Sequence, residues 1–579
     1  MEGEQRGWEK LLPGIAVLRR YERSWLRGDL LAGVTVAAYL VPQVMAYADI
    51  AGLPAVVGLW AILAPLAIYA VLGASRQLSI GPESTTALMT AVGVGALVGA
   101  AGPERYADVA AILAIAVGLV CLLGWALRLG FLAALLSRPV LIGYLVGIAV
   151  LMITSQFGKV TKLEIEGDSP IAETRSLLAQ VGDAHLPTLA VAGVVLTLLF
   201  AMQKLAPRLP GPLIVLLLAA GVVALFGLER HGLDTIGAVP AGLPSPRLPA
   251  LGDLEIWTLL PYAAGIAVVG YSDNVLTGRA FAAKRRQRID ATQELLALGA
   301  VNIGAGLTQG FPVSSSGSRT VLGDATGSRT QLHSLVALAS VVVVLLYAGP
   351  VLASFPTAAL GALVIYAATR LIDVAEIRRI AQFRWSELVL TLITTVAVVA
   401  FGVLIGIGIA IALSIVDLVR RMAHPHDGIL GYPPGVAGMH DVEDYPDATQ
   451  VHGLVVYRYD SPLFFANAEN FLTRATEAVD DAEAPVHWFL LNAEANVEVD
   501  LTAVDTLELL RESLEARGIT FTMARVKQEL RDQLAAAGFV TKVGDEHIFA
   551  TLPTAVRAYA AWHEAEYGDR PAGIPPDIA

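Results

Sequence analysis

The amino-acid sequence predicts a polytopic α-helical membrane protein with a small α/β domain after the last span. Hydrophobic residues make up 55% of the 579 residues and charged residues only 16%, and the mean hydropathy is +0.62. Such values are typical of chains with many membrane-spanning helices and lie outside the range of soluble globular proteins. Apolar stretches of spanning length begin near residue 28 and end near residue 420, and a pattern of soluble strands and helices starts near residue 448.

The apolar region divides into 14 segments, some of them short or broken, when a full span is taken as about 20 residues. Their expected limits are 28–50, 54–73, 80–100, 107–128, 132–156, 186–204, 211–228, 256–280, 290–309, 313–327, 332–354, 356–370, 386–402 and 404–420. Lysine and arginine favour cytoplasmic loops and therefore orient the chain. Basic residues precede the first segment and then follow the even-numbered segments. The sequence therefore predicts that both the N-terminus and the C-terminus lie in the cytoplasm.

Seven segments precede the loop at about residues 229–255, and seven follow it. An odd number of spans in each half predicts two repeats of inverted orientation, a 7+7 arrangement. The positions of two prolines support this arrangement. Pro82 lies about 54 residues after the start of the first segment, and Pro312 lies about 56 residues after the start of the eighth. The alternative is that two kinks coincide by chance in a glycine-rich chain.

Each half contains one interruption that is rich in Gly, Pro and hydroxyl residues, Ser79–Thr86 in the first half and Gly310–Arg319 in the second. Inside a bilayer, unpaired backbone groups are tolerated only where protein or a water-filled cavity surrounds them. Two helix N-termini that face one cavity offer free N–H groups and positive dipole ends to an anion. The pattern therefore predicts an anion site near the middle of the membrane, as an anion transporter requires.

The candidate anion-binding residues are hydroxyl-bearing, small or basic residues at the two interruptions. They are Ser84, Thr85, Ser316, Gly317, Ser318 and Arg319. Hydroxyl and N–H groups bind an anion with the moderate strength that release requires, and Gly317 lets an oxygen approach the backbone closely. Arg319 is a candidate because charges inside the membrane are costly. The alternatives are that the hydroxyls only cap helix ends and that Arg319 only pairs with an acidic side chain.

Two carboxylates are candidates for coupling transport to an ion gradient. Glu83 either caps the helix that follows it or takes up a proton when the anion enters. Asp273 stands in mid-segment, where an ionised carboxylate costs ~2.5–3.5 kcal/mol and needs a partner. Thr277 lies on the same helix face as Asp273, and Ser315 can add an oxygen. A proton needs the carboxylate alone, whereas sodium needs several oxygens. Uncoupled exchange and a fixed pair of Asp273 with Arg319 are further alternatives.

Several short motifs, in order along the chain, match those of one family. They are Asp29–Gly33, Pro42–Ala48, Gly81-Pro82, Phe281-Ala282, Gln293–Leu295, Gly299–Ile303, Gly310–Pro312 and Ser318-Arg319. As an ordered set they resemble the sulfate permease (SulP) family, whose animal relatives include pendrin and the motor protein prestin. The resemblance covers about residues 10–560. It implies a transporter fold of two repeats in which a core domain moves against a gate domain.

Members of this family carry sulfate, bicarbonate, chloride or small dicarboxylates, often as homodimers. The resemblance thus implies secondary active transport of a small inorganic anion, sulfate first and bicarbonate second, across a bacterial plasma (inner) membrane. Gln43 and Tyr47 match family positions that border the substrate, although Tyr47 also suits core packing. Arg319 is expected behind the anion. The pattern Asp273-x-x-x-Thr277 is similar to the sodium-binding face of the cyanobacterial bicarbonate transporter. Glu83 departs from the family, because many relatives have an apolar residue there.

Residues 448–562 resemble the STAS domain that such transporters carry. The other expected parts are a cytoplasmic N-terminal segment 1–27, a transmembrane domain 28–423, a linker 424–447 and a disordered tail 563–579. The stretch Asp500-Leu501-Thr502-Ala503 stands where regulatory STAS domains carry a phosphorylated serine. Leu501 has no hydroxyl, which excludes that switch at its position, and Thr502 is expected to cap the next helix. We expect this domain to support the dimer or to dock a cytoplasmic protein partner.

Several other functions fit less well. The net charge of −12 argues against nucleic-acid binding, and the single cysteine, Cys121, excludes a disulfide within the chain. We expect no enzymatic activity and no cofactor, apart from a coupling sodium ion. Two alternatives are a nucleobase permease of related fold and a membrane-tethered regulator that acts through its STAS-like domain. The Ser316–Arg319 run favours an anion over a nucleobase, and the missing hydroxyl at Leu501 argues against the regulator.

Overall fold

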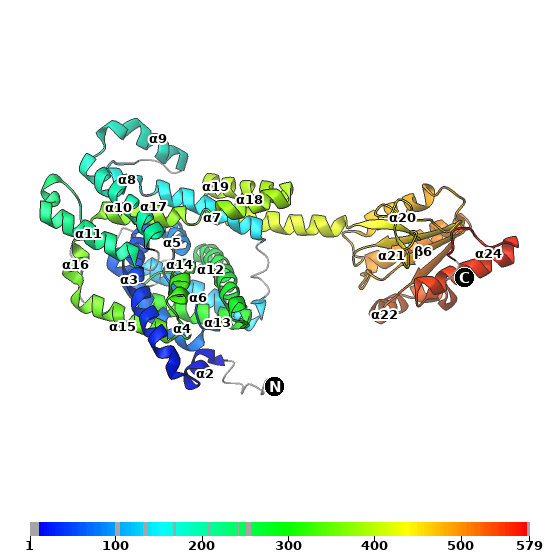
Figure 1. Cartoon of the computed structure of the whole chain (residues 1–579), viewed down its shortest axis with the longest axis horizontal. Coiled ribbons are helices and arrows are strands. Elements are labelled where there is room, and N and C mark those ends of the chain that lie inside the picture. The colour runs from blue at the N-terminus through cyan, green and yellow to red at the C-terminus, as the bar shows by residue number, and fades with distance from the viewer. Residues whose placement is uncertain are drawn as a thin grey trace. The chain divides into compact units, whose positions relative to one another are not determined.

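The computed structural model describes residues 11–98, 105–130, 137–165, 170–206, 209–237, 239–240, 242–250 and 256–575. Residues 1–10 of the predicted N-terminal segment therefore lie outside the described residues. The chain divides into two compact units, Met1–Ser414 and Ile415–Ala579 (Figure 1). The first unit is helical, and the second combines strands and helices.

The first half of the helical unit runs to residue 226. Its helices are α2 (Pro13–Arg19), α3 (Leu26–Ile50), α4 (Ala55–Leu72), α5 (Ser84–Val98), α6 (Tyr106–Ala126), α7 (Arg138–Thr154), α8 (Phe157–Thr161), α9 (Pro170–Gln180), α10 (Leu186–Leu205) and α11 (Gly211–Phe226). The helices of the second half are α12 (Ile256–Lys284), α13 (Ala291–Leu307), α14 (Gly317–Ala325), α15 (Leu332–Tyr347), α16 (Gly349–Ala353), α17 (Thr357–Thr369), α18 (Val374–Phe383) and α19 (Trp385–Ala423).

Each of the 14 predicted segments overlaps a helix, and the last two share α19. Gly402 separates them, because its φ of 80° and ψ of 173° are not helical. By length and composition, seven helical stretches among the described residues can cross a membrane, and α5, α11 and α15 are shorter apolar helices. The polytopic helical fold is thus as predicted.

The two interruptions pair with each other as short antiparallel strands. In β1 (Ile80–Gly81) and β2 (Ser314–Ser315), Ile80 lies opposite Ser315 and Gly81 lies opposite Ser314. The Ser316 N–H also donates to the Ser79 carbonyl at 2.9 Å. The pairing satisfies backbone groups that no helix satisfies, and α5 and α14 begin directly after it. Each half therefore supplies one half-helix, and the two half-helices start at a shared crossing.

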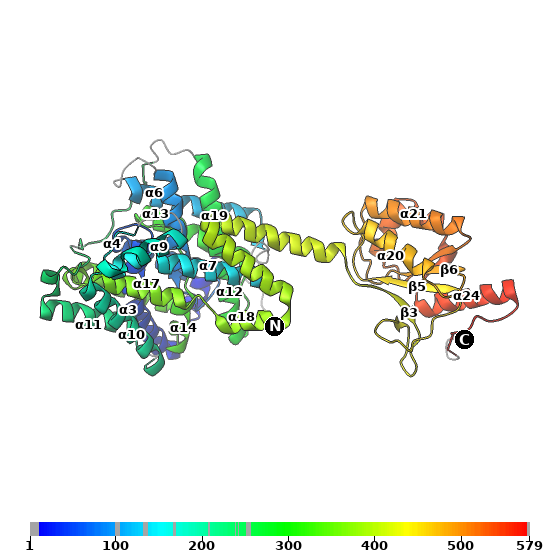
Figure 2. The ribbon, with the colours of Figure 1, turned by 90° about the horizontal axis from the view of Figure 1, so that it is seen from above.

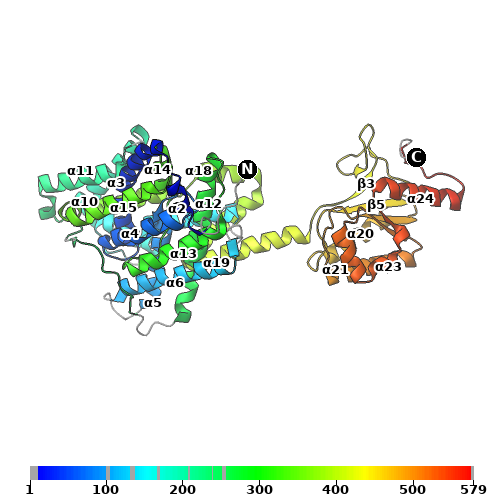
Figure 3. The ribbon, with the colours of Figure 1, turned by 90° about the horizontal axis from the view of Figure 1, so that it is seen from below.

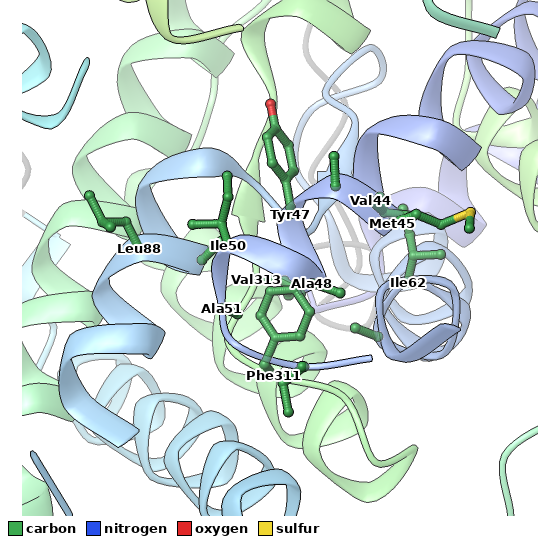
Figure 4. Packing of buried hydrophobic residues seen from close by; sticks show 14 of the residues in the cluster. Val44, Met45, Tyr47, Ala48, Ile50, Ala51, Ile62, Leu88, Phe311 and Val313 are labelled. Carbon is green, nitrogen blue, oxygen red and sulfur yellow. The ribbon is translucent and has the colours of Figure 1, made fainter. Parts of the chain in front are cut away.

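Small residues allow the helices around this crossing to pack closely. A side chain at Gly58 of α4 would come within 2.0 Å of the Val44 carbonyl oxygen of α3, and one at Gly118 of α6 within 2.6 Å of the Gly299 carbonyl of α13. Figure 3 shows α4, α13 and α6 side by side. In Figure 4, Phe311, which precedes β2, is packed among apolar residues of α3. This core holds the crossing in place.

The second unit is a six-stranded sheet with helices on both faces. Its elements are β3 (Asp427–Gly431), β4 (His440–Asp441), β5 (Leu454–Tyr459), α20 (Ala468–Asp480), β6 (Trp488–Asn492), α21 (Leu501–Ala516), β7 (Thr520–Ala524), α22 (Gln528–Ala536), α23 (Phe539–Val543), β8 (Ile548–Phe549) and α24 (Leu552–Tyr567). The strand order is β4-β3-β5-β6-β7-β8, with β5 to β8 parallel and β3 antiparallel to both neighbours. Figure 2 shows α20 and α21 on one face and α24 on the other.

Two strands correct the prediction of a linker at 424–447. Both β3 and β4 lie within that segment, and β3 occupies a place in the sheet between β4 and β5. Proline, glycine and aspartate suggested a linker there. However, the strands are short and draw their stability from pairing, β3 with β5 and β4 with β3, which local composition does not reveal.

The end of the chain corrects the prediction of a disordered tail from residue 563. Helix α24 continues to Tyr567, and the His452 N–H donates to the Ala572 carbonyl at 3.0 Å. Ile574 packs against the apolar cluster between α24 and the sheet. Long-range packing orders the described part of the predicted tail, and residues 576–579 lie outside the described residues.

Candidate functional site

A cavity of about 570 Å³ lies beside the crossing of the two interruptions. It is lined by residues of α3, α5, α12 and α14 and by residues of α7, α10, α11 and α17. The predicted site residues that line it are Gln43, Tyr47, Glu83, Thr85, Asp273, Ser315, Gly317 and Ser318. Gln43 and Ser318, which lie 275 positions apart in the sequence, thus meet around one space.

The half-helices present their N-termini at this cavity. The first N–H groups of a helix have no acceptor within the helix, and α5 begins at Ser84 while α14 begins at Gly317. A side chain at Gly317 would project into open space, since no atom lies within 4 Å of its position. Ser318 Oγ lies 3.2 Å from Ser316 Oγ. This end of α14 therefore offers hydroxyl and backbone donors to a ligand.

Arg319 lies behind the cavity with a fully buried side chain. Its Nη1 donates to Gln43 Oε1 at 3.1 Å and to the Pro82 carbonyl at 2.9 Å. Gln43 Nε2 in turn donates to the Tyr47 hydroxyl at 2.9 Å. Arg319 Nε and Nη2 are buried without a hydrogen-bond partner among the described residues. Buried donors without a partner are costly, and these two nitrogens are donors that an anion can satisfy.

The carboxylate nearest to Arg319 in an ion pair is Glu83, whose Oε2 lies 4.0 Å from Arg319 Nη1. The fixed pair of Asp273 with Arg319, considered as an alternative above, is not among the ion pairs of the described residues. Glu83 precedes α5 directly, and its Oε1 accepts a hydrogen bond from Ser84 Oγ at 3.0 Å. Ser84 therefore orients Glu83 rather than lining the cavity itself.

Asp273 lies on α12, which stays helical through this position. Ser315 Oγ donates to Asp273 Oδ2 at 2.7 Å, and the Thr277 side chain lies within hydrogen-bonding reach of the same carboxylate. Three oxygen-bearing side chains from α12 and β2 thus come together. This set suits a proton on Asp273 and also supplies oxygens of the kind that sodium prefers, so both alternatives stay open.

Some residues at the cavity were not among the predicted ones. Tyr39 lines it one turn before Gln43, and the spacing of Tyr39, Gln43 and Tyr47 on one helix face was a signal that could have identified it. Tyr144 on α7 and Arg370 after α17 also line the cavity. These two come from helices that carry no predicted site residue, and no local motif marks them.

In the second unit, the structure corrects the predicted cap of α21. Asp500 Oδ1 accepts from the Ala503 N–H at 2.8 Å, whereas Thr502 lies inside the helix. Asp500 Oδ2 also accepts from the Phe465 N–H at 2.8 Å. A carboxylate that accepts both bonds leaves no capping role for Thr502, and Leu501 is exposed next to it.

Comparisons with known proteins agree with this architecture. The sulfate permease family matches residues 26–394, and the STAS domain matches residues 445–555. A protein of Mycobacterium tuberculosis (strain CDC 1551 / Oshkosh) named "Probable sulfate transporter" is 57% identical over 553 residues, which cover 96% of this chain and 98% of that protein. "Sulfate transporter 4.1, chloroplastic" of Arabidopsis thaliana is 30% identical over 573 residues, 95% of this chain and 82% of that protein.

Two solved structures share the fold. Murine solute carrier 26 family member A9, solved in the inward-facing state, has a TM-score of 0.87 at 21% identity over 97% of this chain and 96% of that chain. The transmembrane domain of a cyanobacterium bicarbonate transporter has a TM-score of 0.59 at 24% identity over 68% of this chain and 98% of that chain.

Half-helices that meet at a cavity within a polytopic helical unit define a membrane transporter with a central site. The chain belongs to the sulfate permease family, with a C-terminal STAS domain. It is therefore a multi-pass membrane protein that transports an anion, and not an enzyme.

Proposed function

We propose that this protein carries sulfate across the bacterial plasma membrane by secondary active transport. The mycobacterial relative named a probable sulfate transporter is 57% identical along almost the whole of both chains. The observation that carries the proposal is the pair of buried, unpartnered nitrogens of Arg319 behind the two half-helices. Together they place hydrogen-bond donors for an anion inside the membrane unit.

In this proposal, sulfate binds between the first turns of α5 and α14. Their free N–H groups and dipole ends attract the dianion. Thr85 and Ser318 supply hydroxyl donors at the cavity, and Gln43 and Tyr47 border it from α3. Arg319 adds positive charge from behind. Each contact is moderate, which permits release on the other side.

Transport is proposed to follow alternating access. The helices that hold the anion, α3, α5, α12 and α14, form the core side of the cavity, and α7, α10, α11 and α17 form the gate side. A shift of the core along the gate exposes the site alternately to each side of the membrane. The cavity reaches Ala206 and Arg370 at the C-terminal ends of α10 and α17, which are predicted to be cytoplasmic ends. Because the cavity reaches ends of helices that are predicted to be cytoplasmic, as both termini are, we interpret the structure as the inward-facing state.

Asp273 is proposed as the position where a coupling ion is carried. Its hydrogen bond from Ser315 joins the ion position to the strand that leads into α14. Binding of a cation at Asp273 would therefore favour binding of the anion next to it. Both sodium and a proton fit this position. The rest of the proposal is a homodimer, with a STAS domain that supports the dimer or docks a cytoplasmic protein.

Bicarbonate is the second candidate substrate. The oxygen set of Asp273, Thr277 and Ser315 is similar to the sodium-binding face of the cyanobacterial bicarbonate transporter, and the membrane domain of a transporter of that name shares this fold. Family membership and the Arg319 site favour an anion over a nucleobase. The exposed Leu501, which cannot be phosphorylated, gives no support to the regulator alternative.

The test is uptake of labelled sulfate by the purified full-length chain in proteoliposomes. We expect saturable uptake that unlabelled sulfate inhibits more strongly than bicarbonate does. Arg319→Ala should abolish sulfate uptake and binding, whereas Arg247→Ala, which breaks an exposed pair with Asp108, should leave both near the wild-type level. Uptake of bicarbonate without sulfate would support the second candidate. Uptake of uracil or xanthine without either anion would overturn the proposal.

A further inference from the structure

Three charged groups meet at the cavity. They are the Glu83 and Asp273 carboxylates, which line it, and the Arg319 guanidinium behind it. Glu83 Oε2 is buried without a hydrogen-bond partner among the described residues. Arg319 Nη1 lies 4.0 Å from Oε2, too far for a hydrogen bond. Asp273 is held by Ser315 instead, and the two carboxylates repel each other.

The other titratable groups at the cavity do not change the charge that a moving core would carry. The phenols of Tyr39, Tyr47, Tyr144 and Tyr366 line it, and a tyrosine is neutral near pH 7. Arg370 is exposed at the end of α17, on the gate side, so its charge is the same whether the core is empty or loaded.

The core therefore carries one positive and two negative groups at this site. If sulfate entered alone, two further negative charges would join an excess negative charge in a buried space. Burying unbalanced charge is very unfavourable. Either the anion is excluded, or cations enter with it. The Glu83 carboxylate makes this requirement stricter, because it adds a second negative charge at the cavity.

The surroundings of Glu83 suit a proton. The described residues contain no cluster of three His, Cys, Asp or Glu side chains that could hold a metal. Glu83 Oε2 also has no hydrogen-bond partner among them. When protonated, Oε2 becomes a hydrogen-bond donor. It can then donate to a sulfate oxygen in the cavity, and this bond would satisfy an atom that is unsatisfied without the anion.

We propose that each sulfate moves with two cations, a proton on Glu83 and a second cation, proton or sodium, at Asp273. This inference rests on the proposed sulfate function. The proton comes from the aqueous phase that the site faces, binds Oε2 as sulfate draws Arg319 toward itself, and leaves to the opposite phase after sulfate does. The two cations balance the dianion, so the loaded and the empty core carry equal charge and transport is electroneutral. The empty core returns with Glu83 opposite Arg319.

The experiment compares sulfate accumulation at equilibrium in proteoliposomes of the full chain. For wild type, a tenfold proton gradient should raise sulfate accumulation by a factor of about ten through the proton on Glu83. A membrane potential set by a potassium gradient and valinomycin should have no effect on it. Glu83→Gln should lose that factor of about ten. It should also become sensitive to the potential, because one uncompensated negative charge then moves with each sulfate. A hundredfold potassium gradient should change its accumulation by about 100-fold.

Asp324→Asn is the matched control. Asp324 is a carboxylate on α14 that pairs with Arg285 and does not line the cavity. It should behave like wild type in both gradients. Wild-type accumulation that responds to the membrane potential would overturn the inference, as would a Glu83→Gln variant with unchanged proton dependence. Absence of any sulfate uptake by wild type would instead reject the proposed function itself.

A second measurement applies if Glu83→Gln is inactive in transport. Sulfate binding to the detergent-solubilised chain should take up protons from a weakly buffered solution, read with a pH-indicator dye. Per sulfate bound, Glu83→Gln should take up one proton fewer than wild type. Equal proton uptake by the two proteins, or sulfate binding to wild type with no proton uptake, would overturn the role of Glu83.

Discussion

Gly317 shows how a single position shapes the site. It begins α14, and nothing lies within 4 Å of the place that a side chain would occupy. At Gly58 and Gly118 the missing side chain lets two helices approach each other, but at Gly317 the free space belongs to the cavity. The missing side chain thus leaves room for a ligand rather than for a neighbouring helix.

Gly317→Ala should weaken sulfate binding without destabilising the fold. The methyl group would project into the cavity at the helix N-terminus. We expect the dissociation constant of sulfate to rise about tenfold, equivalent to about 1.4 kcal/mol, with an unchanged melting temperature. Binding titrations and thermal melts in detergent measure the two effects. Unchanged affinity would show that the anion does not approach this end of α14.

Arg319 contributes through its geometry as well as its charge. Its planar guanidinium donates to Gln43 and to the Pro82 carbonyl while two nitrogens stay free. A lysine is a point charge that cannot reproduce this fork. The guanidinium therefore links α14 to α3 and to the start of α5, and still has donors available for an anion.

Arg319→Lys should keep the charge and still impair transport. One ammonium group cannot make both existing bonds and also reach an anion. We expect sulfate affinity to fall by about tenfold or more, since each charge-assisted hydrogen bond contributes roughly 1.5–3 kcal/mol. Affinity equal to that of wild type would mean that positive charge alone suffices. Sulfate titration of the purified variant distinguishes the two results.

At the scale of elements, close contacts between helices hold the crossing of the two interruptions. Gly58 of α4 packs against the α3 backbone near Val44. The same helix α3 carries Gln43 and Tyr47 to the cavity. The position of these two side chains therefore depends on how closely α3 and α4 approach.

Gly58→Ala should destabilise the membrane unit by about 1–3 kcal/mol, because its methyl group would overlap a backbone oxygen that cannot move aside. Gly95→Ala is the control, since Gly95 of α5 has no atom within 4 Å of that position. It should be neutral or stabilising by roughly 0.5–1 kcal/mol. Melting temperatures in detergent test the contrast. Equal effects of the two substitutions would contradict the packing argument.

The STAS unit has its own electrostatic link between elements. Glu508 of α21 accepts hydrogen bonds from Arg511 at 2.9 Å and from Lys542 of α23 at 3.1 Å. Bonds from Arg511 lower the pKa of the Glu508 carboxyl, partial burial opposes them, and Lys542 lowers it further. Since the pKa is lower in the folded state, this link stabilises the fold above the unfolded pKa and is lost as the pH falls through the folded one.

Glu508→Gln should reduce the stability of the STAS unit by up to about 1 kcal/mol near neutral pH. The difference from wild type should shrink only as the pH falls below the ordinary pKa of a glutamate, about 4.3, toward the lower pKa of the Glu508 carboxyl in the folded protein. Glu515→Gln is the control, because Glu515 bonds the same Arg511 from an exposed position and should matter less. A difference that is constant with pH would contradict this account. Thermal melts of the full chain at several pH values measure it.

At the scale of the whole molecule, the two halves contribute different charges to one site. Glu83 comes from the first half, and Asp273 and Arg319 come from the second. Asp273 also contacts Ser315, which takes part in the pairing of the two interruptions. A hydrogen bond therefore joins the proposed cation position on α12 to the strand that leads into the proposed anion position on α14.

Asp273→Asn should remove one coupling cation and thereby identify it. If sodium binds there, sulfate accumulation in proteoliposomes should become independent of the sodium gradient. If a proton binds there, dependence on the proton gradient should weaken by a factor of about ten for a tenfold gradient. Counterflow of sulfate against sulfate should persist, because the anion donors are intact. Accumulation unchanged in both gradients would reject a coupling role for Asp273.

The sequence by itself determined the polytopic helical fold, the two interruptions and the soluble α/β domain. Hydropathy and proline or glycine placement are local properties, and the bilayer makes them decisive because lipid cannot satisfy a broken backbone. The same reasoning led to Gly317 and Arg319. Composition misled at residues 424–447 and 563–575, where order comes from β5 and the sheet rather than from local preference.

Only the tertiary structure decided which charges face each other. Sequence left Arg319 without a defined partner, and the fold brings it opposite Glu83, more than 200 residues away, while Asp273 turns to Ser315. Tyr144 and Arg370 reach the cavity from helices that carry no motif. Such neighbours depend on how distant helices pack, and in a low-dielectric interior the partner of a charge decides what that charge can do.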